Sequence, residues 1–250
     1  MCIRDRQPLT GRRLLAQTLR QFTRQVPGMF AAAPLAFILF VMSLPGALLL
    51  DQIGGPRERW LLAAAIVCLL SLARLVVAWQ HYLNESPAKP ALRIDGAYLR
   101  VLALLTGVAA LIVGLKSFST SLGVVLYFKM PGTPSVVFLT LMLLLWLAIW
   151  LPVMHRLGAW SLSLPQAALA GRYGLGQSRR WLRGRVWPFA ALLLLLTAST
   201  AIATGSLTKA LHTRWLDAIA TGAGALIITL VLVLAFAIQC AIAYRERGEA

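Results

Sequence analysis

Six long runs of apolar residues, separated by short polar segments, dominate the pattern of the chain. Each run is close to the roughly 20 residues that an α-helix needs to cross the core of a bilayer. The runs are continuous and do not alternate, and lipid offers no partner to an open strand edge, so helices are the expected spanning form. The pattern predicts an all-α, polytopic transmembrane helical bundle with six spans, at residues 29–50, 60–79, 97–115, 135–154, 187–204 and 221–243.

The composition agrees with this prediction. Hydrophobic residues make up 59% of the chain, charged residues 13%, and the mean hydropathy is +0.77. Soluble domains carry about 25% charged residues. We therefore expect an integral membrane protein with a single membrane domain over residues 29–250.

Two short segments precede this domain. Residues 1–6, MCIRDR, resemble the transposon end sequence that tags sequencing libraries, read in frame, so we treat them as an artefactual tag. Residues 7–28 predict a cytoplasmic amphipathic helix that ends at Pro27-Gly28 and lies on the membrane surface. Its apolar positions recur at i, i+4, i+7 and i+11, and they are Leu15, Leu19, Phe22 and Val26.

The net charge of +16 is distributed unevenly among the segments between the spans. By the positive-inside rule, the richer set of segments is cytoplasmic, which places both termini in the cytoplasm. An arginine excess confined to such short segments argues against nucleic-acid binding. The richer set holds Arg12, Arg13, Arg20, Arg24, Lys89, Arg93, Arg100, Arg156, Arg172, Arg179, Arg180, Arg183, Arg185, Arg245 and Arg247; the poorer set holds Arg57, Arg59, Lys116, Lys129, Lys209 and Arg214.

The segment between the fourth and fifth spans is the richest in arginine. In GQSRRWLRGRVW, Ser178 is a candidate N-cap, and Trp181 and Leu182 can enter the membrane interface. Each cationic side chain near an anionic leaflet is worth about 1 kcal/mol. The candidate anionic-lipid contacts are Arg172, Arg179, Arg180, Arg183 and Arg185.

The stretch Leu122 to Phe128, LGVVLYF, lies between Lys116 and Lys129 and is too short to span a bilayer. It fits an interfacial or re-entrant piece outside the cytoplasm, or a continuation of the third helix. We favour the interfacial piece.

Arg74 is the charged residue that lies well inside a predicted span. It is about 7 to 8 Å from the cytoplasmic end of its helix, so its guanidinium can snorkel to the headgroups. Gln239 in the sixth span lies at a similar depth. A second interpretation therefore joins Arg74 and Gln239 in a polar intramembrane site, with the two side chains hydrogen-bonded across the helices.

The sequence shows no catalytic, cofactor or metal-binding pattern. His81, His155 and His212 lie at helix ends or in loops and lack the HExxH spacing of a zinc protease. Cys68 and Cys240 fall inside predicted helices, where a thiol acts as a small hydrophobe. We therefore predict no cofactor and do not expect an enzyme.

Two longer stretches carry a resemblance. RLGAWSLSLPQAALAGRYGLGQSRRWLRGRVW and AWQHYLNESPAKP resemble segments of a broad family of uncharacterised bacterial six-helix membrane proteins. That family is distantly similar to the membrane domain that precedes some glycerophosphodiester phosphodiesterases. The resemblance implies a six-helix fold in a bacterial inner membrane. No catalytic residue can be carried over from it, because the enzyme domain would follow the membrane region.

Two functions from different classes follow from the sequence. The first is a non-catalytic scaffold or accessory in envelope or lipid handling, which contacts the bilayer, anionic phospholipid headgroups and either a membrane protein partner or a second copy of itself. The alternative is a small-solute or lipid transporter, or flippase, that works around Arg74 and Gln239. A polar cavity at these two residues would favour transport, and a tightly packed bundle would favour the scaffold.

Overall fold

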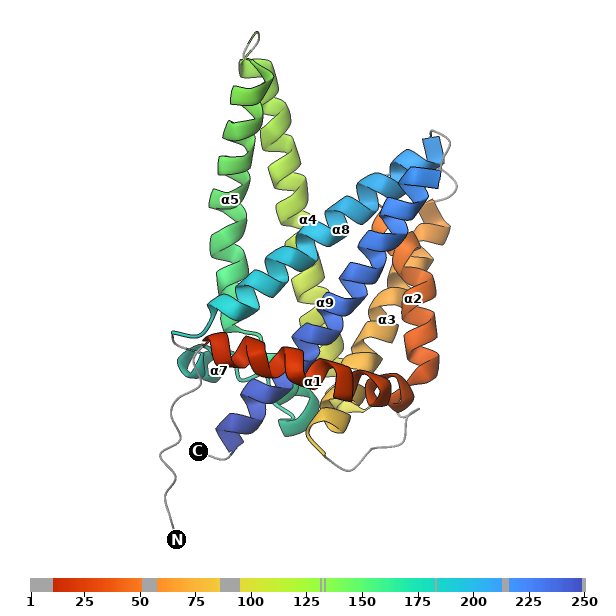
Figure 1. The fold of residues 1–250 in the computed structure, drawn as a ribbon, viewed down its shortest axis with the longest axis vertical. Helices are drawn as coiled ribbons and strands as arrows, with labels where there is room; N and C mark the ends of the chain where they lie inside the picture. Colours follow the sequence, from red (N-terminus) through yellow and green to blue (C-terminus); the bar gives the residue numbers. More distant parts are fainter. Residues whose placement is uncertain are drawn as a thin grey trace.

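The computed structural model describes residues 11–50, 58–85, 95–130, 132, 134–182, 184–212 and 216–248, and these form helices and short connections (Figure 1). Residues 1–6 of the expected tag and Arg183 lie outside the described residues. The elements are α1 (Gly11–Ala32), α2 (Pro34–Leu49), α3 (Glu58–Leu83), α4 (Gly96–Lys129), α5 (Ser135–Ala159), α6 (Ser163–Pro165), the π-helix η1 (Gln166–Ala170), α7 (Leu175–Trp181), α8 (Trp187–His212) and α9 (Leu216–Gly248).

Five of these helices are long and apolar enough to cross a membrane: α3, α4, α5, α8 and α9. The helices α1 and α2 meet at an angle of 98°, and the bent pair gives up to one more span. The chain is therefore an all-α, multi-pass membrane protein, as the apolar pattern predicts. Of the predicted first span at 29–50, residues 34–49 form α2, whereas Met29 to Ala32 belong to α1.

The bend lies after the expected break at Pro27-Gly28, which is a second correction. Pro27 is inside α1, and the carbonyl of Thr23 that loses its donor belongs to an exposed residue. The chain turns at Ala33, whose φ of −155° is not helical, and Pro34 then occupies the first turn of α2, where proline is tolerated. The buried indole of Trp79 in α3 donates to the carbonyl oxygen of Met29 at 2.9 Å and holds α1 beside this bend.

The stretch Leu122 to Phe128 continues α4, so the interfacial piece that we favoured is wrong. Lys116 looked like a membrane boundary in the sequence, but it is half-buried on the helix and its flexible stem lets the ammonium lie away from its own Cα. The methyl group of Met142 in α5 packs over Gly123, which is buried. At 34 residues α4 is about 51 Å long, well beyond a hydrocarbon core of about 30 Å.

The core lies where α1, α2, α3, α8 and α9 meet. Its largest fully buried side chains include Trp79, Phe40, Phe189 and Ile238. A smaller cluster joins α3 to α4 and η1 through Val76 and Ala167. The outer end of the α4–α5 hairpin rises above the other helices in Figure 1, while Trp150 and Met154 of α5 pack in a cluster with α8, and only 6% of the apolar window of α4 and of α5 is buried.

One end of the bundle gathers segments that are far apart in the sequence. Gly11 at the start of α1 lies against the ring of Pro188 at the start of α8. The end of α9 meets the end of α3 through an ion pair of 3.3 Å between Arg245 and Glu85. This end therefore gathers the described parts of the segments that the charge pattern assigns to the cytoplasm, while their orientation relative to the membrane faces stays a prediction.

Candidate functional site

The arginine-rich segment is fixed to the bundle by buried polar contacts. The hydroxyl of Ser178 in α7 is fully buried and donates to the carbonyl oxygen of Ala159 at 2.7 Å. Gly174 has a φ of +56°, and the amide of Gln166 lies directly against its Cα, where any Cβ would collide with it. Leu182 after α7 is buried in the main core. The segment is thus held in a defined place on the bundle.

The arginines of this segment face outward. Arg172, Arg179 and Arg180 are exposed, and Arg185 is half-buried. The indole of Trp187 beside them is 56% exposed. Arginines next to an exposed tryptophan suit the zone between headgroups and acyl chains.

The helix α1 runs across the lower end of the molecule in Figure 1, which confirms the predicted helix in this region. Its packed face carries Leu14, Thr18 and Met29. Of the predicted apolar face, Leu15 is 38% exposed and Leu19 is 73% exposed. The helix therefore presents one apolar face to the protein and an adjoining one outward, a division that a single apolar stripe in the sequence does not reveal.

We call the arginines of α1 and of the α7 segment the basic end. Its members are Arg12, Arg13, Arg20, Arg24, Arg172, Arg179, Arg180 and Arg185, all exposed except the half-buried Arg185. The sequence contains no aspartate or glutamate from residue 11 to 50 or from residue 96 to 216. Because the contact of Gly11 with Pro188 joins the two segments, their charges reinforce one positive potential.

The structure places Arg74 and Gln239 in different surroundings. Arg74 is half-buried and interacts electrostatically with Tyr98 of α4, whose hydroxyl donates to the carbonyl oxygen of Leu70 at 3.4 Å. Gln239 is fully buried in α9, and neither atom of its amide has a hydrogen-bond partner among the described residues. The hydrogen bond considered between the two is therefore not formed, and a polar site that contains both stays a prediction.

Sequence reasoning missed further buried glutamines near the basic end. Gln80 of α3 is fully buried and donates to the carbonyl oxygen of Ala237 in α9 at 3.3 Å. One turn further along α9, the thiol of Cys240 lies 3.7 Å from the carbonyl oxygen of Ser161, in the connection between α5 and α6. The signal in the sequence is a glutamine within an otherwise apolar helix.

Several buried polar side chains near these contacts form no hydrogen bond with the described residues. The amide of Gln166 and the hydroxyl of Ser161 are buried and, like the Gln239 amide, form no hydrogen bond with the described residues. Leaving such a group unpaired costs about 1 to 3 kcal/mol, so internal water is the expected partner.

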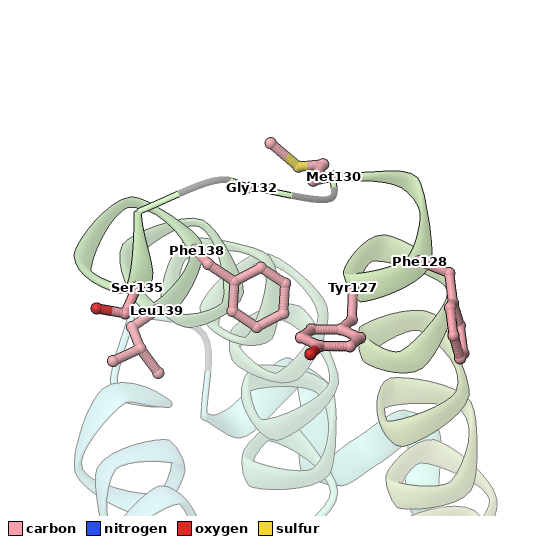
Figure 2. A pocket seen from close by; sticks show the side chains of 7 residues that line it. All are labelled: Tyr127, Phe128, Met130, Gly132, Ser135, Phe138 and Leu139. Atoms are coloured by element: carbon pink, nitrogen blue, oxygen red, sulfur yellow. The ribbon is translucent and has the colours of Figure 1, made fainter.

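A pocket of about 540 Å³ lies at the tip of the α4–α5 hairpin. The rings of Tyr127 and Phe138 meet edge to face there, with centroids 5.9 Å apart, while Phe128 points away from α5 (Figure 2). The lining carries no ionisable group except the Tyr127 phenol, so it is suited to apolar contact rather than to catalysis.

Candidate catalytic groups do not converge in the described part of the chain. No group of three His, Cys, Asp or Glu residues that could hold a metal ion occurs among the described residues. His155 packs edge-on against Trp187 with ring centroids 5.5 Å apart. Cys68 and Cys240 are buried free thiols in α3 and α9.

No protein-family model, curated protein or solved structure matches this chain.

Proposed function

We propose that this protein is a non-catalytic membrane scaffold or accessory in envelope or lipid handling, and that it gathers anionic phospholipid headgroups at the basic end. One observation carries the proposal: two distant segments that carry arginines and no acidic residue are joined at the contact between Gly11 and Pro188. The resemblance to a membrane domain that precedes some glycerophosphodiester phosphodiesterases supports a role near phospholipids.

The energetics favour headgroup binding. Each arginine near an anionic leaflet contributes about 1 kcal/mol, and the contribution falls off within a Debye length of about 8 to 10 Å. The buried anchors Ser178 and Leu182 fix the position of the α7 arginines. Less ordering entropy is therefore lost when a headgroup binds.

The test is the composition of the lipid shell around the protein in nanodiscs that contain phosphatidylglycerol and phosphatidylcholine. In the variant R179Q/R180Q, we expect the enrichment of phosphatidylglycerol to fall several-fold. The matched control is R59Q/K129Q, which removes two charges from exposed positions outside the basic end, and it should leave the enrichment intact. Equal loss in both variants would contradict the proposal.

Transport is the second candidate function, because the unpaired buried amides of Gln166 and Gln239 could face a water-filled path. Cys240, next to Gln239, reports on such a path. In a chain with Cys2 and Cys68 replaced by alanine, we expect Cys240 to stay unreactive toward a water-soluble maleimide until the protein is denatured, since the thiol is fully buried. Rapid labelling of the folded protein would favour transport; Tyr244→Cys, at a half-buried site, is the positive control.

A further inference from the structure

Beside its contact with α8, α1 carries a cationic side chain and apolar side chains on one exposed face. Arg12, Leu15 and Leu19 follow i, i+3, i+7 spacing and therefore lie along one face of the helix. All three are exposed. The arginine can bind a lipid phosphate, and the adjoining leucines can contact the acyl chains of the same lipid.

The opposite side of the same contact repeats this arrangement. Pro188, which touches Gly11, follows the exposed Trp187, and Arg185 precedes Trp187 by two residues. The peptide N–H of Arg185 donates to the carbonyl oxygen of the buried Leu182 at 2.7 Å, which fixes its backbone. Arg179 and Arg180 lie on the adjacent α7 and are exposed.

We propose that the surface where the start of α1 meets the start of α8 binds one phospholipid that carries two phosphates, such as a diphosphatidylglycerol. One phosphate pairs with Arg12 of α1, and the other pairs with Arg185 and the α7 arginines. This inference rests on the proposed function, since it specifies which anionic lipid the basic end prefers.

The separation of the cationic groups on two elements is the reason for two phosphates. A headgroup with one phosphate can engage the α1 side or the α8 side, whereas a linked pair engages both as one ligand. Once the first phosphate is bound, the second is held at a high effective concentration, and affinity rises without new kinds of contact. Arginine is suited to both contacts because its guanidinium binds phosphate oxygens in a bidentate manner.

The exposed apolar groups indicate a lipid rather than a soluble phosphate compound. Leu19 on one side and Trp187 on the other are 73% and 56% exposed, and both adjoin the arginines in sequence or on the helix face. A ligand that carries its own acyl chains can contact these apolar side chains and the arginines together, which a soluble phosphate compound cannot do.

The experiment is native mass spectrometry of the full chain in detergent, titrated with tetraoleoyl diphosphatidylglycerol, with dioleoyl phosphatidylglycerol at matched phosphate, and with glycerophosphate. We expect the two-phosphate lipid to bind roughly tenfold more tightly than phosphatidylglycerol, and glycerophosphate not to bind. In R12Q/R185Q, the preference should fall to that of phosphatidylglycerol. The control R59Q/K129Q should keep the preference.

The outcomes separate this inference from the proposed function. If both phospholipids bind equally well, or if R12Q/R185Q keeps the preference, the two-phosphate site is wrong while binding at the basic end survives. If neither phospholipid binds, both proposals fail. Tight binding of glycerophosphate would overturn the lipid assignment, because it shows that the arginines suffice without acyl chains.

Discussion

At the scale of single residues, a few polar groups decide where the cationic segment lies. Ser178 and Gln166 are both fully buried, but their roles differ: the Ser178 hydroxyl is hydrogen-bonded, and the Gln166 amide forms no hydrogen bond with the described residues. The amide packs instead against Gly174, whose positive φ permits the turn into α7. This glycine is thus required both for its backbone conformation and for the missing Cβ.

We expect Gly174→Ala to loosen the α7 segment. An alanine at a φ of +56° costs about 1 to 2 kcal/mol, and its methyl group must also displace the Gln166 amide. Limited trypsin digestion should then cleave after Arg172, Arg179 and Arg180 several-fold faster than in the parent chain.

Gly176→Ala is the matched control, because an added Cβ at Gly176 meets open space within α7 and alanine favours helix. Its cleavage rate should not increase. Faster cleavage in both variants would mean that the close approach of Gln166 is not what holds the segment.

At the scale of elements, the relation of α1 to α2 is the feature that no propensity scale predicts. Proline occurs in both helices, as Pro27 and Pro45, without ending either. The bend occurs at Ala33, where Pro34 starts a new helix and Trp79 binds the Met29 carbonyl from α3. A contact between elements thus places the bend.

We expect Trp79→Phe to weaken this bend. The variant leaves the buried Met29 carbonyl without its donor, which costs about 1 to 3 kcal/mol. The thermal unfolding midpoint in detergent should fall. The distribution of distances between spin labels at Leu19 and Leu35, which are both exposed, should become broader. Trp60→Phe, at a side chain that is 80% exposed, should change neither quantity, and an equal effect would contradict the assignment.

At the scale of the whole molecule, the chain separates a packed unit from a projecting hairpin. The helices α1, α2, α3, α8 and α9 share one core, whereas the α4–α5 hairpin buries little of its apolar surface. Helix association in lipid depends on close packing and hydrogen bonds, because lipid tails already satisfy apolar side chains. The exposed leucines and valines of the hairpin are therefore compatible with a bilayer around them.

The arrangement also makes a prediction about membrane orientation. With the native cysteines replaced by alanine, single cysteines at Leu19 and Tyr173 should both be protected from an impermeant maleimide added to intact cells. A cysteine at Trp60, at the opposite end of α3, should react, and all three positions are exposed on the protein. Labelling at Tyr173→Cys in intact cells would show that the basic end faces outward.

The sequence determined the class of the fold and the supply of charge. Long apolar runs must become helices because only helices satisfy their own backbone in lipid, and this holds whatever the tertiary structure. The sequence alone indicates Arg172, Arg179 and Arg180 as candidate anionic-lipid contacts, because no acidic residue lies near them in the chain.

The tertiary structure alone decided which of these residues meet. Segments that are distant in the chain are joined by the contact of Gly11 with Pro188 and by the hydrogen bond from Trp79 to Met29. The burial of Gln80 and Gln166 likewise depends on packing between distant segments. Local pattern carries no information about such pairings, because an exposed Leu19 and a packed Leu14 are equivalent in hydropathy. It is packing between helices that assigns one leucine to the core and leaves the other for lipid.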